Sequence, residues 1–359
     1  MNKFTKIIAF LCVVTAFTAC KKDSDPIIEV PPSGGSSMTL NGLIGSEAGA
    51  SAGNSVFVDF SADKQTSVAR ESWDLGFYSG SDFRVILNHT VGATAIALAG
   101  NDLTKVTAAD TTGLVAANTL ALGQGEGGFS TIDPVQGNAA TYLAGTVIKA
   151  VSATDADNKV YIVNRGATGV TANRGWEKIR VLRNGNGYTL QYAKINETTF
   201  KTLTVTKDPN FNFKYVSFVK GAVDVEPAKA AWDIQWSIST YEATATIPYT
   251  FSDFVLINFV GGVTAAEVIY SGTAANSKVS YADFTDANLT GITFLNNRQV
   301  IAGNWRITSG TPVGVKTDRF YLVKDGTGNI YKLKFVSFHP NDSGVRGKPV
   351  IEYKLVKKA

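Results

Sequence analysis

An internal repeat constrains the fold of this 359-residue chain more than any other feature. Trp-Asp-Leu at 73–75 returns as Trp-Asp-Ile at 232–234. The preceding block FVDF at 57–60 returns as YVSF at 215–218. Blocks that recur at long range indicate a duplicated structural unit. The sequence therefore predicts two halves of similar construction.

Two further blocks keep the same order in both halves. LNHTVGATA at 87–95 matches INFVGGVTA at 257–265, with a constant shift of 170 positions. The stretch 181–192 matches 322–335, and each contains a Gly-rich turn between two apolar runs. One matching block arises easily by chance, but four blocks in the same order favour duplication.

Each half reads as β structure. YTLQY at 188–192 and YKLKF at 331–335 alternate apolar and polar residues, which is the period of a half-buried strand. Asn-Gly and Asp-Gly turns precede them and predict hairpins, because these residues accept positive φ. Short helices are expected only at 112–122 and 263–270, so the predicted fold class is all-β with few short helices.

Four segments follow from this interpretation. Residues 1–19 are predicted to be a signal peptide, and 20–38 a lipidated tether rich in Pro, Gly and Ser. Two tandem β domains are expected at 39–205 and 206–359.

The N-terminus has the features of an exported protein. Lys3 and Lys6 precede an apolar run at 7–17, which is far short of the ~20 residues that span a bilayer. The string FTAC that ends at Cys20 resembles a bacterial lipobox, which implies cleavage before Cys20 and its acylation. The alternative is an ordinary signal peptide with an incidental cysteine.

Cleavage at Cys20 would change the composition of the chain. The formal net charge falls from +4 to +2 when Lys3 and Lys6 leave, which gives no basic field for nucleic acid. The charged cluster KKDSD after Cys20 resembles export signals of surface lipoproteins in Bacteroidetes-type bacteria. We therefore expect an outer-membrane lipoprotein, held to the membrane by its lipid and exposed at the cell surface.

No enzyme active site is predicted. Trp73 and Trp232 are expected in the core, with Asp74 and Asp233 accepting backbone N–H bonds at strand ends. A catalytic acid pair would need a second carboxylate at matching spacing in both repeats, and none recurs. The chain has two histidines and no G-x-S-x-G motif beside either, and no metal site is expected.

Together these blocks resemble the HmuY-like lipoproteins, here as a tandem two-repeat member. The order is Phe-x-x-Phe, Trp-Asp-Leu or Trp-Asp-Ile, an Asn/Gly/Thr-rich turn and a hairpin with a Gly-rich turn. The ending FVSFHPNDSGVRGKPVIEYKL at 335–355 is the most similar piece. The resemblance covers most of residues 50–357.

The resemblance implies an all-β protein that captures haem at the cell surface for iron acquisition, without catalysis. It also implies partners, namely a haem-carrying protein and an outer-membrane receptor. Family sites use axial His or Met side chains, so His89 and His339 are the candidate haem ligands, with Met38 or a tyrosine as a further partner. The alternative is a structural, adhesive or carbohydrate-binding β lipoprotein that binds no haem.

Overall fold

The computed structural model describes residues 31–167 and 172–359. The predicted signal peptide, Cys20 and the tether as far as residue 30 lie outside these ranges. In the described part of the chain, no helix has the length and apolar character needed to cross a membrane.

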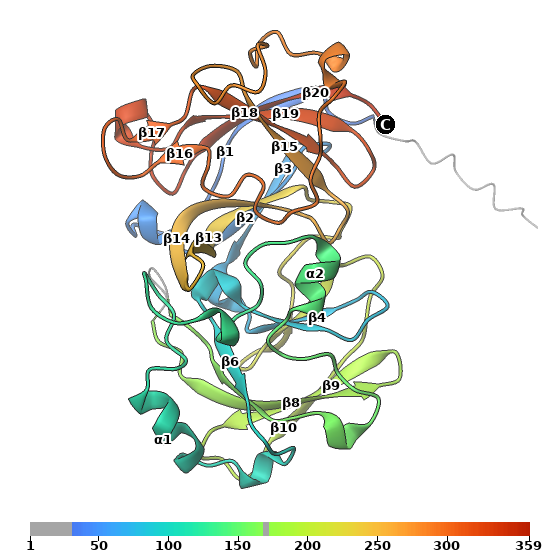
Figure 1. The fold of residues 1–359 in the computed structure, drawn as a ribbon. Coiled ribbons are helices and arrows are strands. Elements are labelled where there is room, and N and C mark those ends of the chain that lie inside the picture. Colours follow the sequence, from blue (N-terminus) through green and yellow to red (C-terminus); the bar gives the residue numbers. More distant parts are fainter. Residues whose placement is uncertain (1–30, 168–171) are drawn as a thin grey trace, which may run out of the picture. The chain divides into compact units, whose positions relative to one another are not determined.

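Antiparallel sheets dominate the fold, as the sequence predicts, and the described residues contain two α-helices (Figure 1). One four-stranded sheet has the order β12-β11-β4-β5. Its strands are β4 (Leu75–Tyr78), β5 (Val85–Leu87), β11 (Phe213–Ser217) and β12 (Gly221–Val223). A five-stranded sheet has the order β10-β9-β8-β7-β6. Its strands are β6 (Thr94–Ala97), β7 (Tyr161–Asn164), β8 (Trp176–Asn184), β9 (Gly187–Lys194) and β10 (Lys201–Val205).

A second pair of sheets repeats this arrangement. The four-stranded sheet β14-β13-β2-β3 contains β2 (Asn54–Asp59), β3 (Lys64–Ala69), β13 (Ile234–Thr244) and β14 (Ile247–Ile257). The five-stranded sheet β1-β20-β19-β18-β15 contains β1 (Gly35–Thr39), β15 (Thr264–Ile269), β18 (Arg319–Lys324), β19 (Ile330–Ser337) and β20 (Val350–Lys357). A small ribbon joins β16 (Arg306–Ile307) to β17 (Gly314–Val315).

The pairing of the strands does not follow the division of the sequence into an N-terminal and a C-terminal half. Strands β4 to β12 pair only with one another, whereas β1, β2 and β3 pair with strands of the C-terminal half. Val58 lies opposite Ile234, and Met38 lies opposite Ile351. Hydrogen-bonded pairs therefore cross the predicted boundary at residue 205, and the division into two separate domains stays a prediction.

Two large cores follow the two groups of strands. The smaller one lies between β4, β5, β11 and the five-stranded sheet β6 to β10, and includes Leu75, Val163 and Val216. The larger one fills the second group and extends to residues at the junction with the first, such as Trp73 and Tyr215. Trp73 and Trp232 both belong to this larger core, as predicted.

The predicted hairpins are confirmed. β8 pairs with β9 across the Asn-Gly turn, and β18 pairs with β19 across the Asp-Gly turn. The predicted helix at 263–270 is wrong, because this stretch forms β15 and pairs with β18. Composition also placed 35–38 in the tether, whereas these residues belong to β1, which adds an edge strand to β20.

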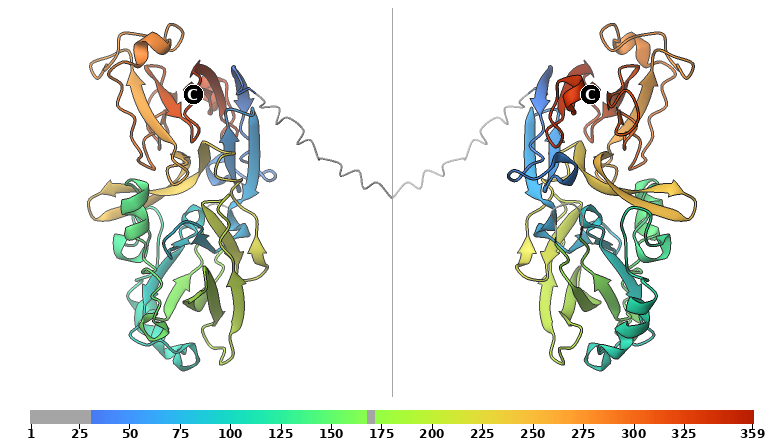
Figure 2. Two further views of the ribbon diagram at one scale, coloured as in Figure 1. Left: turned by 90° about the vertical axis from the view of Figure 1, so that its right-hand side faces the viewer. Right: turned by 90° about the vertical axis from the view of Figure 1, so that its left-hand side faces the viewer.

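Both α-helices lie in the long connection between β6 and β7. α1 covers Ala109–Ala116, near the predicted helix at 112–122, and α2 covers Ala139–Ala144. The segment with α2 lies beside the β13–β14 hairpin in both views of Figure 2. It also contacts the loop between β15 and β16, where Arg298 N–H donates to Gly137 O at 3.2 Å and Asn296 Oδ1 accepts the Ala139 N–H at 3.1 Å. This connection closes one side of the site described next.

Candidate functional site

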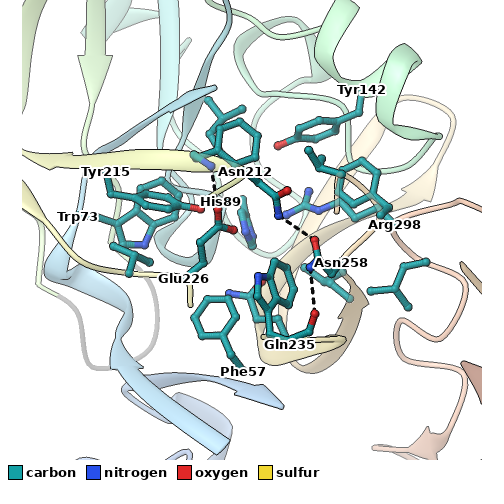
Figure 3. Close-up of a pocket in the computed structure, with 18 residues that line it drawn as sticks. Phe57, Trp73, His89, Tyr142, Asn212, Tyr215, Glu226, Gln235, Asn258 and Arg298 are labelled. Atoms are coloured by element: carbon teal, nitrogen blue, oxygen red, sulfur yellow. Dashed lines mark hydrogen bonds between the residues drawn. The ribbon is translucent and has the colours of Figure 1, made fainter. Parts of the chain in front are cut away.

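A cavity of about 50 Å³ lies where the two groups of strands meet (Figure 3). Both aromatic and polar side chains line it. The aromatic ones are Phe57, Trp73, Tyr142, Phe213, Tyr215, Trp232 and Phe259. The polar ones are His89, Asn212, Glu226, Gln235, Asn258 and Arg298.

His89, a predicted haem ligand, is one of the polar residues in this wall. It begins the short 3-10 helix η3 (His89–Val91), which Asn88 caps by accepting the Thr90 N–H at 3.0 Å. The Asn88 amide also donates to the Trp73 carbonyl at 2.8 Å, which ties the turn to the connection between β3 and β4. His89 is thereby held with its ring beside Trp73, at a centroid distance of 6.3 Å.

The surroundings of His89 favour the neutral imidazole. Burial, followed by the positive charge of Arg298, lowers the pKa of His89 well below its usual 6.5. The Nδ1 atom lies 3.4 Å from Ser239 Oγ on β13. A neutral ring at pH 7 keeps a nitrogen lone pair that can accept a hydrogen bond or ligate a metal.

Glu226 provides a buried carboxyl in the wall of the cavity. Its Oε1 accepts the Phe213 N–H at 2.8 Å. Burial raises the pKa of Glu226 to about 8, although the Phe213 N–H favours the ionised form. The group is therefore protonated at neutral pH and can donate a hydrogen bond as well as accept one.

Arg298 supplies the positive charge of the site. Its guanidinium lies 5.2 Å from the ring centre of Tyr142, which projects from α2. Tyr142 in turn makes an edge-to-face contact with Phe259 at 5.1 Å. The α2 segment and the loop that carries Arg298 therefore close the cavity together.

The repeat brings equivalent positions to this one place. His89 and Phe259 are related by the shift of 170, and both line the cavity. Asn88 and Asn258 are also related, and Asn258 donates to the Trp232 carbonyl at 2.9 Å as Asn88 does to that of Trp73. The Trp232 Nε1–H is buried and has no partner among the described residues.

His339, the second predicted ligand, does not line this cavity. It caps the short 3-10 helix η8 (Pro340–Asp342) between β19 and β20, where its Nδ1 accepts the Asn341 N–H at 3.3 Å. Its backbone N–H donates to Asp342 Oδ1 at 2.8 Å. Met38, named as a further partner, lies on β1 and packs against the larger core. The structure does not bring His89 and His339 to a common cavity.

Sequence reasoning missed most residues of the cavity, among them Tyr142, Glu226 and Arg298. None of these three lies in a repeated block or beside a recognisable motif. The only usable signal was the position of His89 in a block whose second copy carries Phe259. Within residues 31–167 and 172–359, no group of three or more His, Cys, Asp or Glu side chains is placed to hold a metal ion.

A second concave site lies on the β13–β14 hairpin and shares no lining residue with the cavity. This groove has a volume of about 750 Å³. Its aromatic residues are Tyr241, Tyr249, Phe251 and Phe254. Sequence reasoning did not identify it.

Comparison with known proteins gives one assignment. The sequence profile of the family described as HmuY protein matches residues 51–353 in a match that spans both repeats. No curated protein and no solved structure matches the chain. Because the profile covers most of the chain, including the cavity and both Trp-Asp blocks, this chain belongs to the HmuY family.

Proposed function

We propose that this protein is a surface lipoprotein that captures haem for iron acquisition and catalyses no reaction. The observation that carries the proposal is the placement of His89, a neutral imidazole enclosed by aromatic side chains, in a chain of the HmuY family. Haem iron takes imidazole in many proteins.

The chemistry around His89 suits a planar ligand with an acidic edge. Trp73 and Tyr215 would pack against the porphyrin ring, with the apolar contact that aromatic side chains provide. Arg298 would pair with a propionate, since its guanidinium carries the positive charge of the cavity wall. In this role His89 binds the iron, and the other residues orient the ring.

The volume of the cavity sets a condition on this proposal. Pockets for ligands of this size measure about 300–1,000 Å³, and the cavity beside His89 has about 50 Å³. Haem therefore requires the wall to open. We expect the α2 segment to move, because Tyr142 on α2 covers one side of the cavity and one attachment of this segment, the Gln136–Glu242 hydrogen bond of 3.0 Å, is exposed.

The location of the protein is part of the proposal. A lipid on Cys20 would hold the chain in the outer membrane, facing the cell surface, where a haem-carrying protein would deliver haem. A receptor in the outer membrane would then receive it. This arrangement gives the folded body access to haem outside the cell.

Titration with hemin tests the proposal on the chain from residue 32 onward, which contains both cores. We expect a shifted Soret band. His89→Ala should remove or weaken it, whereas His339→Ala should leave it unchanged because His339 caps a 3-10 helix. A wild-type chain without any Soret shift would refute haem capture. Equal behaviour of both variants and the wild type would refute ligation by histidine.

A further inference from the structure

The groove on the β13–β14 hairpin has the features of a binding site that the haem proposal does not use. It lies between the two strands of the hairpin and the loop at 302–309. Its volume of about 750 Å³ is within the range of pockets that hold small ligands. It is far larger than the cavity beside His89, which measures about 50 Å³.

Aromatic rings form the floor of the groove. Tyr241 and Tyr249 lie directly opposite each other on β13 and β14, with ring centres 5.6 Å apart. Tyr241 stacks on Phe254 at 5.2 Å, and Tyr249 contacts Phe251 at 5.9 Å. Phe254 is buried, whereas the other three rings are half-buried and present part of their faces to the groove.

A buried arginine holds this floor in place. The Arg306 guanidinium lies 5.4 Å from the ring centre of Phe254 and 5.7 Å from that of Phe251. It donates to the Ser252 carbonyl, so the strand between the two rings is fixed as well. Rings that are already held lose little freedom when a ligand binds, which favours affinity.

Polar groups with free hydrogen-bonding capacity surround the floor. The groove is lined by Tyr241, Tyr249, Asn304, Thr308 and Ser309, whose hydroxyl and amide groups make no hydrogen bond in the described part of the chain. Hydroxyl and amide groups can both donate and accept. They therefore suit a ligand that carries many hydroxyl groups.

The charge of the groove restricts the ligand further. Its lining has one acidic residue, Glu242, which accepts from Gln136, and one basic residue, Arg306, which is bound to a backbone carbonyl. Among the described residues of the lining, the formal charges of Glu242 and Arg306 cancel, and Arg306 is buried. A neutral ligand fits this balance of charge, whereas a ligand with two acidic groups, such as haem, does not.

We propose that the groove binds a neutral oligosaccharide whose pyranose rings stack on Tyr241 and Tyr249. The C–H face of a pyranose with equatorial hydroxyls is apolar and flat, so it packs on an aromatic ring. Its hydroxyl edge then meets Asn304, Thr308 and Ser309. The proposal concerns a second site and does not depend on haem binding.

Calorimetric titration of the chain from residue 32 onward tests this with three neutral probes, cellohexaose, maltohexaose and mannohexaose. A hyaluronan hexasaccharide serves as the anionic probe. We expect at least one neutral probe to bind more tightly than the anionic one. Tyr249→Ala should weaken this binding by about tenfold, the effect of losing one stacking ring. Tyr249→Phe keeps the ring and should retain most of the affinity.

Phe200→Ala is the matched control, because Phe200 is an exposed aromatic residue outside the groove, between β9 and β10. This variant should bind the probe as the wild type does. The proposal fails if none of the neutral probes binds, or if Tyr249→Ala binds as tightly as the wild type. It also fails if hemin displaces the bound oligosaccharide. The Soret titration should be the same for Tyr249→Ala and wild type, so a failure of either proposal can be recognised separately.

Discussion

Asp74 and Asp233 occupy equivalent positions in the two repeats, and each accepts the backbone N–H of a phenylalanine at the end of a neighbouring strand. Asp74 Oδ2 accepts from Phe218, and Asp233 Oδ2 accepts from Phe60, both at 2.8 Å. This confirms the role predicted for both residues. Each bond fixes the end of the strand that carries the Phe-x-x-Phe block or its counterpart.

The two carboxyls differ in their counter-charges. Asp74 forms ion pairs with Arg165 at 2.9 Å and with Arg174 at 3.0 Å. No ion pair is found for Asp233 among the described residues, and burial raises its pKa to about 8. The two positions therefore share the hydrogen bond to a phenylalanine N–H and differ in the positive charges beside the carboxyl.

Replacement by asparagine should separate these two situations. Asn keeps an oxygen that can accept the phenylalanine N–H, so each variant removes chiefly the acid. Asp74→Asn leaves Arg165 and Arg174 without their shared anion and should lower the free energy of unfolding by about 3–5 kcal/mol. Asp233→Asn should raise the free energy of unfolding at pH 7, because the wild-type carboxyl, ionised in the unfolded chain, must take up a proton on folding and the amide need not. Urea denaturation measures both, and a loss in both variants would contradict the account.

Stability should fall as the pH rises from 6.5 to 8. Glu226 and Asp233 have ordinary pKa values of 4.5 and 3.8, and each is raised to about 8 by burial. The folded state then holds protons that the unfolded state has lost, so the stabilisation is complete below about pH 4 and disappears as the pH passes through 8. Each of these two carboxyl groups lowers the free energy of unfolding by at most about 1.4 kcal/mol for each unit by which the pH rises.

The window avoids the opposing contribution of His89. Its pKa is lowered on folding, so its effect on stability changes only below its unfolded pKa of about 6.5. Glu226→Gln and Asp233→Asn should each flatten the decline measured by denaturation at several pH values. Glu126→Gln, which alters an exposed carboxylate, is the control. A decline of unchanged slope in both test variants would show that other groups cause it.

Replacing Lys332 with an apolar residue should lower the stability of the protein, even though Lys332 is a buried cation. Its Nζ donates to the Tyr281 carbonyl at 2.7 Å and the Phe284 carbonyl at 2.8 Å, and the residue is buried. Lys332→Met leaves two buried carbonyls without a donor, at about 1–3 kcal/mol each. Lys334→Met on the same strand removes a partly exposed pair with Glu352 and should change the stability by less than about 1 kcal/mol. Similar losses in the two variants, measured by urea denaturation, would count against this explanation.

Cys20→Ser should release the protein from the membrane fraction. The prediction depends on the lipobox at the end of the apolar run, since acyl chains on Cys20 would supply the anchor. Fractionation of cells that express each form, followed by immunoblotting, measures the distribution. Cys12→Ser alters the other cysteine and should leave the protein membrane-bound. Retention of the Cys20→Ser form would mean that another segment holds the chain.

The local signals in the sequence predicted the local structure well. The hairpins at β8–β9 and β18–β19 follow from alternation and turn residues, which act over a few positions. The stretch 263–270 has a short apolar pattern that fits helix or strand, and its pairing with β18 decides the outcome. The same holds for 35–38, which look like a tether until β20 supplies a partner.

The site was harder to predict because it depends on residues far apart in the chain. Glu226 and Arg298 meet His89 only through the arrangement of the sheets, and neither belongs to a repeated block. The groove offered a local signal that was not used. Tyr249 and Phe251 alternate along β14, and a strand with aromatic residues on one face indicates a surface available for contact.

The grouping of the strands also determines the order in which the strands can pair as the chain becomes available. β4 to β12 pair among themselves, so this part can be completed once residue 223 has been made. Val58 on β2 must wait until Ile234 on β13, which lies far along the chain, is available for pairing. During that interval β2 and β3 are an isolated hairpin, which is marginally stable in water. The amino-terminal hairpin is therefore made first and must remain soluble while the part that follows it folds.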